Sequence, residues 1–454
     1  MSFLSEGKTD VINIFNRLRK RDFSGYFGLA IKNSLYQFST SWVSQVGTLL
    51  FTIIIARMLL PELFGLYSLA LSTIILFASF SDMSTGTTLM KFVSSALGKK
   101  KISKAKSYTY YLLKVRIWLT CFVAIVLLAA SKFIANNYYH KPIFLALVAG
   151  VTYLFFSSMV SFFTSVFMSS NNFKQIFHKE IFFQIVRLVI VPLSVVLTLK
   201  SLMSQESIIL IIILALTFSQ FVVLLFLIAR TKRLEFLKGT LKKISSLEKK
   251  KINKFMLPLS ATALSGIFFG YIDIVMLGKF VSGEFIGYYR AAFSLVGAII
   301  PLIAFSLVLF PIFGRLKGAR LESSFKKSVK LASLTSLILI PIIVFASPLI
   351  INLIFGKEYT SAVPIFQILS LIVFSTPIID LYTTYIMVKG NTKVVAQFLI
   401  TSTIMNIALN YFLITWFLSY SQFIAVIGAA IATLISRYLL LVGLVLFKKY
   451  KMSK

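Results

Sequence analysis

Long apolar stretches alternate with short polar ones along the whole chain, and this pattern predicts membrane-spanning helices. A helix needs about 20 mostly apolar residues to cross the hydrocarbon core of a bilayer. Twelve stretches meet this requirement: residues 34–59, 65–90, 106–130, 143–168, 175–199, 206–229, 255–279, 285–313, 329–354, 362–388, 393–416 and 422–446. The pattern therefore predicts an all-α polytopic membrane protein of about twelve transmembrane helices.

The basic residues test this segmentation and orient it. With a cytoplasmic N-terminus, 36 of the 47 Lys and Arg residues fall in cytoplasmic tails and loops, and six fall at the outer ends and loops. Because cytoplasmic loops are enriched in Lys and Arg, this bias predicts a multi-pass protein of the cell membrane with both termini cytoplasmic. A total of ten or fourteen helices would leave the sign of the bias unchanged.

The composition excludes the soluble classes that its charge would otherwise suggest. The chain has 454 residues and a net charge of +33, but 58% of its residues are hydrophobic and only 13% are charged. A soluble nucleic-acid-binding protein would carry more charged residues, and a soluble domain this apolar would expose large sticky patches. We therefore expect anionic membrane lipids, and no nucleic acid, as partners of the basic loops.

A short motif occurs once in each half of the chain. Residues 62–70 (ELFGLYSLA) and residues 284–292 (EFIGYYRAA) both fit Glu-x-x-Gly-x-Tyr-x-x-Ala, at an offset of 222 positions. Each copy lies in the hairpin between the first two predicted helices of its half, so both halves begin on the same side of the membrane. Two such halves are related by a pseudo-twofold axis along the membrane normal.

This duplication predicts two six-helix bundles that can rock about a central cavity and expose it to each side in turn. The first segment is expected to be a basic amphipathic helix on the inner leaflet, with a solvated tail as the alternative. The predicted parts are a cytoplasmic N-terminal segment 1–33, a bundle 34–230, a basic cytoplasmic linker 231–254, a second bundle 255–446 and a basic cytoplasmic tail 447–454.

Motifs of catalysis and of cofactor binding are not found in the sequence. It has no phosphate-binding Gly-Lys-Thr loop, no Gly-x-Ser-x-Gly elbow and no Cys/His spacing suited to a metal. His140 and His178 are predicted near opposite membrane faces, so they cannot share a site. We therefore expect no catalytic residue, no cofactor and no bound metal, and a transport step driven by a gradient or by the substrate itself.

Ionisable residues inside the membrane are functional candidates because a charge in lipid is costly. The basic candidates for a central cavity are Arg57, Lys114, Arg116, Arg187 and Arg290, and the candidates for gating or ion coupling are Asp82, Asp273 and Asp380. A cavity lined by guanidinium groups would attract an anion such as a phosphate, whose oxygens match the guanidinium fork. Asp273 and Arg290, both towards the outer side, could form a gate that substrate charge breaks.

Several of these residues have a simpler alternative role. The basic side chains of Arg57, Lys114 and Arg116 could extend to the headgroups. Asp82 could cap a helix, and Asp380 could pair with Arg437 as a structural lock. Arg187, near the middle of the membrane, has the fewest alternatives, and we expect it to face a hydrated cavity.

Four stretches of the chain resemble a known family. They are ARMLLPELFGLYSLA (56–70) followed by Asp82 and Gly86, DIVMLGKFVSGEFIGYYRAA (273–292), LIFGKEYTSAVPIFQILS (353–370) and IGAAIAT (427–433). They are similar to segments of the polysaccharide transporters, the Wzx-type flippases of the multidrug/oligosaccharidyl-lipid/polysaccharide superfamily. The resemblance covers nearly the whole chain, but its motifs are degenerate and mostly structural.

The resemblance implies two six-helix bundles in a V shape and a monomer. It also implies translocation of a polyprenyl-diphosphate-linked oligosaccharide from the cytoplasmic to the outer leaflet. The sequence does not show whether a proton or Na⁺ is coupled to this step; Asp82, Asp273 and Asp380 are the embedded carboxylates that could bind such an ion. One alternative is a cation-coupled multidrug exporter of the same superfamily, in which acids and not bases should dominate the cavity. The other is a membrane glycosyltransferase or polysaccharide polymerase, which would need a larger outer loop than the predicted ones.

Overall fold

The computed structural model describes residues 25–201, 203–303 and 318–451, and in these ranges the regular elements are all helices. The main α-helices are α2 (Gly25–Asp82), α3 (Thr85–Gly98), α4 (Ile102–Lys132), α5 (Phe144–Ser169), α6 (Phe173–Lys200), α7 (Gln205–Thr231), α8 (Ser246–Phe280), α9 (Gly283–Ile303), α11 (Gly318–Ile354), α12 (Ala362–Ser370), α13 (Ile372–Val388), α14 (Thr392–Leu418) and α15 (Gln422–Lys451). Three short helices of other types connect them: η1 (Phe133–Tyr139), η2 (Glu235–Leu237) and η3 (Lys357–Tyr359).

Ten stretches of the described chain are long and apolar enough to cross a membrane. The first of them, Lys32–Gly98, contains the first two predicted helices, which are separated at Leu60 (φ 58°) and Pro61. The left-handed residue and the proline that follows it interrupt helical hydrogen bonding and divide α2 into two arms. The described part of the eighth predicted helix is α9. The prediction of an all-α polytopic membrane protein is confirmed.

Several predicted helices have different limits in the structure. The second predicted helix, 65–90, breaks at Met83 and Ser84, which both have positive φ, and continues as α3 to Gly98. The helix expected at 255–279 begins already at Ser246, where Ser245 and Glu248 form a capping box. Polar residues continue a helix beyond the bilayer without any apolar signal, so hydropathy alone underestimates its length.

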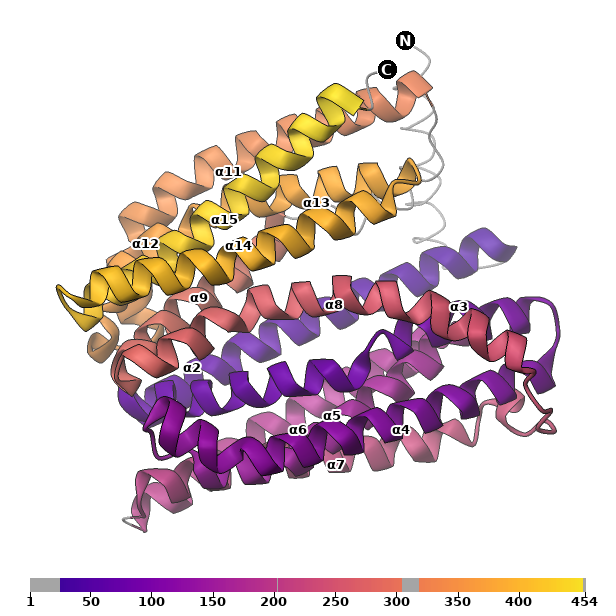
Figure 1. Ribbon diagram of the computed structural model, residues 1–454, viewed down its shortest axis with the longest axis horizontal. Coiled ribbons are helices and arrows are strands. Elements are labelled where there is room, and N and C mark those ends of the chain that lie inside the picture. Colours follow the sequence, from indigo (N-terminus) through magenta and orange to yellow (C-terminus); the bar gives the residue numbers. More distant parts are fainter. Residues whose placement is uncertain (1–24, 202, 304–317, 452–454) are drawn as a thin grey trace.

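The helices form two groups that converge at one end of the molecule and diverge at the other (Figure 1). A single cluster of buried apolar residues joins both groups at the converging end, from Phe51 on α2 to Ala430 on α15. At the diverging end the described residues form two separate clusters. One combines the first group with Ile252 and Met256 of α8, and the other lies within α11, α13, α14 and α15. The V shape follows from this split of the core.

The repeated motif lies where the two groups meet. A Cβ atom added at Gly65 would come within 1.8 Å of the Gly283 carbonyl oxygen, and one at Gly287 within 2.1 Å of the backbone of α2. Only glycine permits backbones to approach this closely. The Glu62 carboxylate also accepts a hydrogen bond of 2.6 Å from the backbone N–H of Glu284. The two copies of the motif therefore form the crossing point of α2 and α9.

Two further contacts close this end of the molecule. The Arg57 guanidinium on α2 donates hydrogen bonds to the carbonyl oxygens of Leu353 and Ile354, the last residues of α11. The Tyr359 hydroxyl donates to the Ala56 carbonyl oxygen at 2.8 Å. Burial raises the pKa of Tyr359, so its hydroxyl remains a donor at every physiological pH. The converging end is thus held by side chains as well as by backbone packing.

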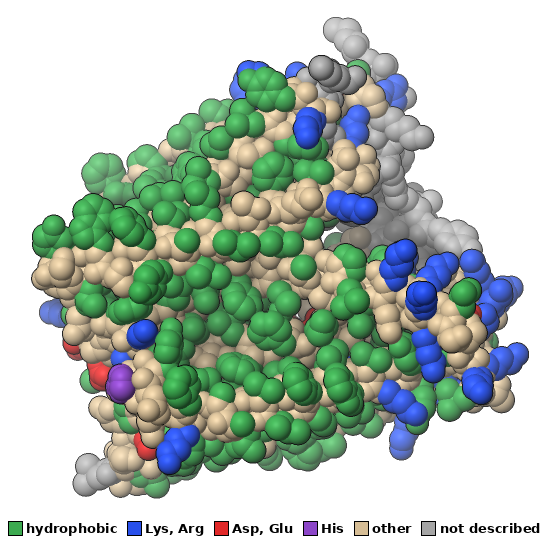
Figure 2. All heavy atoms as spheres, viewed as in Figure 1, with side chains coloured by type: hydrophobic (Ala, Val, Ile, Leu, Met, Phe, Trp, Pro, Cys, Tyr) green, Lys and Arg blue, Asp and Glu red, His purple; other side chains and the backbone are tan. Residues whose placement is uncertain are grey.

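Basic side chains gather at the diverging end (Figure 2). The loops at this end, and the linker between α7 and α8, are the segments that the sequence predicts to be cytoplasmic. The lipid-facing sides are covered by exposed apolar side chains, among them Trp118 on α4 and Phe345 on α11, at 67% and 85% exposure. The fold therefore has an apolar belt, a basic end and a V that opens at the basic end.

Candidate functional site

A cavity of about 220 Å³ lies between the two bundles. Its walls come from the first arm of α2, from α8 and from α9, and are formed by Gln45, Thr48, Leu49, Thr52, Gly270, Tyr271, Arg290, Phe293, Ser294, Gly297 and Ala298. These residues combine hydroxyl, amide and guanidinium groups with aromatic surface. Pockets with a few convergent polar groups in apolar walls are the default candidates for ligand sites.

Arg290 is the basic residue that lines this cavity directly. It lies on α9 of the second bundle, with its guanidinium 5.8 Å from the centre of the Tyr271 ring. Among the described residues no carboxylate forms an ion pair with it. Arg290 therefore contributes a half-buried charge that no carboxylate in the described part of the chain neutralises by contact.

Arg187 approaches the same cavity from α6 of the first bundle. Its guanidinium donates to the Gln184 side-chain oxygen at 2.6 Å and to the hydroxyl of Thr48, a cavity-lining residue, at 3.3 Å. It also lies over the rings of Phe51 and Phe183, at 4.3 and 5.0 Å. The side chain is buried and its Nε–H has no hydrogen-bond partner.

The two arginines meet the cavity from opposite sides. Arg290 lines it, and Arg187 donates a hydrogen bond to Thr48, which also lines it. Arg187 and Arg290 come from different bundles, so an anion held between them would contact both halves of the molecule. The predicted cationic cavity thus has a concrete candidate pair, one guanidinium on each side.

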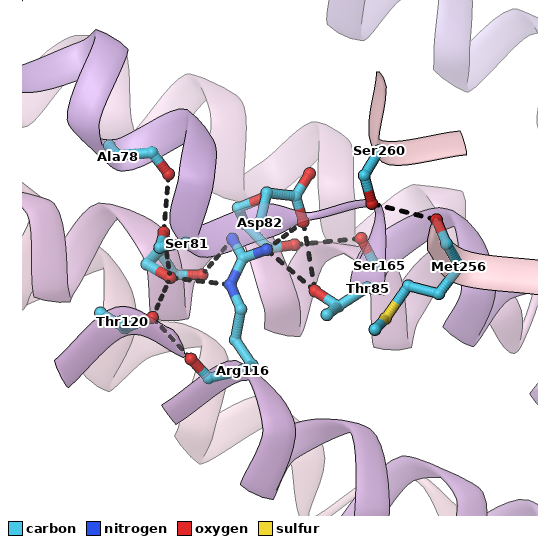
Figure 3. Close-up of polar contacts among 11 residues, drawn as sticks. Ala78, Ser81, Asp82, Thr85, Arg116, Thr120, Ser165, Met256 and Ser260 are labelled. Atoms are coloured by element: carbon cyan, nitrogen blue, oxygen red, sulfur yellow. Dashed lines mark hydrogen bonds and ion pairs between the residues drawn. The ribbon is translucent and has the colours of Figure 1, made fainter. Parts of the chain in front are cut away.

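Arg116 lies instead in a network inside the first bundle. Its guanidinium forms an ion pair with Asp82 at the end of α2, and it donates to Thr85 at 2.9 Å and to the Ser158 hydroxyl at 2.7 Å (Figure 3). A further bond of 2.8 Å joins Ser158 to Thr120. The network spans the break between α2 and α3, and the Asp82 carboxylate neutralises Arg116 by direct contact.

Arg57 and Lys114 are not brought to the cavity either. The Arg57 guanidinium contacts the carbonyl oxygens at the end of α11, as described above. Lys114 is exposed on α4, and its ammonium lies 4.7 Å from the centre of the Tyr110 ring. Of the five basic candidates, the structure therefore brings Arg187 and Arg290 to the cavity and places Arg57, Lys114 and Arg116 elsewhere.

The two remaining acidic candidates lie in the second bundle. Asp273 on α8 is buried and accepts hydrogen bonds from Tyr289 at 2.5 Å, Asn410 at 2.8 Å and Thr433 at 2.6 Å. These three donors are neutral, and Asp273 forms no ion pair with Arg290. Asp380 on α13 lies near Arg437 without an ion pair within 4 Å, and the Arg437 guanidinium lies over Phe269 at 4.5 Å instead.

A further buried carboxylate, absent from the acidic candidates predicted from the sequence, lies on α6. Glu180 on α6 is only 6% exposed, forms an ion pair of 2.8 Å with Lys179 and accepts a hydrogen bond of 2.8 Å from Gln184. Glu180 falls within the helix predicted over residues 175–199, but it is not among the acidic candidates predicted inside the membrane. The spacing of Glu180, Gln184 and Arg187 at i, i+4 and i+7 marks one face of a helix and would have revealed it.

A bound metal has no obvious place in the part of the chain that the structure describes. No three His, Cys, Asp or Glu side chains gather there as metal ligands would. The candidate site is therefore made of hydrogen-bond donors and cationic groups at a cavity between two bundles. Its chemistry suits the binding of an anion with several oxygen atoms.

The fold is that of membrane transporters. It is similar to a multidrug resistance MATE family transporter of the MOP superfamily in an inward-facing conformation, with 16% identity and a TM-score of 0.70 over 90% of this chain and 96% of that one. It is also similar to the lipid II flippase MurJ in an inward closed conformation, with 15% identity and a TM-score of 0.67 over 90% of this chain and 87% of that one.

The family follows from the sequence. Residues 30–317, more than half of the chain, match the family described as polysaccharide biosynthesis protein, and the chain belongs to this family. A curated relative is the teichuronic acid biosynthesis protein TuaB of Bacillus subtilis, which is 29% identical over 107 residues. That match covers 22% of this chain and 22% of the relative. The resemblance inferred from the hairpin motifs is confirmed.

Proposed function

We propose that this protein is a flippase that moves a polyprenyl-diphosphate-linked oligosaccharide from the cytoplasmic to the outer leaflet of the cell membrane. The observation that supports it best is the pair Arg187 and Arg290. These are guanidinium groups of opposite bundles at a cavity, and among the described residues neither forms an ion pair with a carboxylate. Membership in the polysaccharide biosynthesis family and the transporter fold support the same substrate class.

The V shape and the cavity define a route. The diphosphate enters the cavity from the cytoplasmic end while its lipid tail stays in the bilayer, and the guanidinium groups bind its oxygens. Rocking of the bundles then opens the cavity to the outside. An inside-negative membrane potential favours the outward movement of negative charge, by about 2.3 kcal/mol per charge for each 100 mV. Both termini are cytoplasmic in this proposal, as the charge bias indicates.

Ion coupling has a candidate residue in Asp273. Its carboxylate is buried and is surrounded by the neutral donors Tyr289, Asn410 and Thr433. A proton or Na⁺ would supply the positive charge that these donors lack, whereas Asp82 is already paired with Arg116. We therefore expect Asp273→Asn to remove any dependence of transport on an ion gradient.

A reconstituted transport assay tests the proposal. Proteoliposomes receive a fluorescent polyprenyl-diphosphate-linked oligosaccharide, and a membrane-impermeant quencher reports the leaflet in which it resides. Arg187→Gln and Arg290→Gln should each lower the initial rate by about tenfold, because a charged hydrogen bond contributes about 1.5–3 kcal/mol. Lys114→Gln is the matched control: it also removes a basic residue of a transmembrane helix, but one that points away from the cavity.

Two results would contradict the proposal. Rates unchanged in the double variant Arg187→Gln/Arg290→Gln would show that the cationic cavity does not bind the substrate. Export of lipophilic cations, with no movement of the labelled oligosaccharide, would instead identify a multidrug exporter. A glycosyltransferase or polymerase would lengthen the oligosaccharide in the presence of a sugar donor, which mass spectrometry of the same vesicles would detect.

A further inference from the structure

A chain of hydrogen bonds on α6 connects a buried carboxylate to one of the cavity arginines. The Lys179 ammonium contacts Glu180 at 2.8 Å, Gln184 donates to Glu180 at 2.8 Å, and Arg187 donates to Gln184 at 2.6 Å. The last link of the chain is the bond from Arg187 to Thr48 on the cavity wall. All these groups lie at the face between α6 and the first arm of α2.

The hydrogen-bonding chemistry of Arg187 and Glu180 fixes the orientation of the Gln184 amide between them. A guanidinium can only donate hydrogen bonds, and an ionised carboxylate can only accept them. Gln184 must therefore turn its oxygen to Arg187 and its NH₂ group to Glu180. Without the acceptor at Glu180 the amide could rotate and present its NH₂ group to Arg187, where two donors would oppose each other.

Arg116 shows the effect of a direct contact with a carboxylate, which the Gln184 amide prevents at Arg187. Its guanidinium touches the Asp82 carboxylate directly and is neutralised. At Arg187 a neutral amide stands between the guanidinium and the carboxylate, so the group is oriented while its charge stays available to a ligand. A buried charge without a contact partner is costly, and such an arrangement is understandable where an incoming anion supplies the missing charge.

A glycine on the neighbouring helix leaves room for this amide. A Cβ atom added at Gly47 would come within 2.5 Å of Cδ and Oε1 of Gln184. An alanine at this position would displace the amide, although Gly47 is not among the residues that line the cavity. The orientation of Gln184 therefore depends on packing from α2 and on the acceptor from α6.

We propose that Glu180 is a positioning residue: through Gln184 it holds the Arg187 guanidinium oriented towards a diphosphate in the cavity. This inference rests on the proposed function, because it assigns the same anion site. It adds a residue that never contacts the substrate and that determines how well the first bundle binds it.

Binding of geranylgeranyl diphosphate to the full-length protein in nanodiscs tests the inference. Arg187→Gln should weaken binding about tenfold, as for the loss of a charged hydrogen bond. Glu180→Leu should weaken it about fivefold, and Glu180→Gln should restore near-normal affinity because its amide oxygen can still accept from Gln184. Gly47→Ala should act like Glu180→Leu.

The double variant Glu180→Leu/Arg187→Gln separates positioning from general damage. If Glu180 acts through Arg187, its loss adds nothing once Arg187 is absent, so the double variant should bind like Arg187→Gln alone. Glu322→Leu is a matched control, since it removes an ion-paired carboxylate of the second bundle that is bonded to Lys448 and Tyr385, away from the cavity arginines. If Glu180→Leu does not fold, Gln184→Met replaces it in the binding measurement, because it also breaks the link between Glu180 and Arg187.

The outcomes distinguish this inference from the proposed function. Normal affinity in Arg187→Gln would contradict the anion site itself. Weak binding in Arg187→Gln together with normal binding in Glu180→Leu would overturn the positioning role alone. Glu180→Leu could also weaken binding as much in the Arg187→Gln background as in the unaltered protein. This result would overturn the positioning role too, because the effect would then not pass through Arg187.

Discussion

At the scale of single residues, the charge that a basic side chain offers depends on what it touches, not on its depth in the membrane. Arg116 is the most deeply buried of the five basic candidates, at 2% exposure, yet its charge is matched by Asp82. Arg187 has an amide, a hydroxyl and two aromatic rings as neighbours. The first arrangement stabilises a bundle, and the second leaves a charge for an anion.

The Arg116 network makes a prediction about stability. Asp82→Ala should destabilise the protein because it leaves a buried guanidinium without its counter-charge. Breaking a buried pair costs about 3–5 kcal/mol, but the Asp82 side chain is 36% exposed, so we expect about 2 kcal/mol after screening by solvent. Thermal unfolding in detergent, followed by tryptophan fluorescence, measures the loss.

The reverse substitution checks the cause of that loss. Adding Arg116→Met to Asp82→Ala should recover much of the stability, since the unpaired charge disappears with it. Transport per folded molecule should stay near that of the unaltered protein in the double variant. A double variant less stable than Asp82→Ala would show that Arg116 contributes through other contacts, and a loss of transport in it would assign Arg116 to the substrate path.

The sequence could supply the candidates but not this distinction. Hydropathy estimates depth along one axis and singles out charges within predicted helices. It carries no information on which face of a helix meets which neighbour, so it could not show that Arg116 pairs with Asp82 and that Arg187 bonds to the amide of Gln184. Glu180 is missing from the candidates for the same reason, because depth along the membrane does not show that its side chain is buried.

At the scale of elements, the two bundles depend on a backbone crossing that the repeat motif encodes. Gly65 on α2 and Gly287 on α9 lie at this crossing, and each would collide with the backbone of the other helix if it carried a Cβ atom. The repeat was visible in the sequence as a duplicated hairpin. That its two copies contact each other could not be inferred, since pseudo-symmetry relates them without stating their distance.

A substitution at the crossing should shift the balance of conformations. Gly65→Ala should separate the outer ends, because backbone at 1.8 Å cannot give way as a flexible side chain would. Spin labels at Lys200 and Tyr420, exposed positions at the outer ends of the two bundles, should report a longer distance in pulsed electron paramagnetic resonance. The labels are introduced after Cys121→Ser, since the native cysteine is exposed.

A second glycine substitution controls for the loss of helix flexibility. A Cβ atom added at Gly266 on α8 has no neighbour within 4 Å, so Gly266→Ala should leave the Lys200–Tyr420 distance unchanged. An unchanged distance in Gly65→Ala would contradict the prediction, because it would show that the crossing of α2 and α9 accommodates a methyl group. The same distance change in both variants would attribute the effect to helix rigidity.

At the scale of the whole molecule, the core itself indicates how the bundles move. One apolar cluster joins them at the converging end, whereas the diverging end has one cluster of the first bundle with Ile252 and Met256 of α8 and another within the rest of the second bundle. Moving to an outward-open form would break contacts of the shared cluster, together with the bonds of Arg57 and Tyr359. An anion that touches both Arg187 and Arg290 supplies new contacts between the bundles in exchange. Substrate would thereby favour closure of the cytoplasmic end.

This exchange predicts opposite changes at the two ends of the molecule. Labels at Lys99 and Lys389, exposed just after α3 and α13 at the end proposed to be cytoplasmic, should approach each other when the lipid-linked oligosaccharide is added to nanodiscs. The outer pair at Lys200 and Tyr420 should separate under the same conditions. A pair within the first bundle, Lys99 and Lys232, should keep its distance because the bundle moves as a unit.

The arginine pair provides the decisive comparison for this movement. In Arg187→Gln/Arg290→Gln the substrate can no longer bridge the bundles, so the cytoplasmic pair should stay apart at substrate concentrations that close the unaltered protein. Lys114→Gln should close normally. If substrate still brings the labels at Lys99 and Lys389 together in the double arginine variant, contacts other than those of Arg187 and Arg290 cause the closure. Distances that change in the same direction at both ends would contradict rocking about a central cavity.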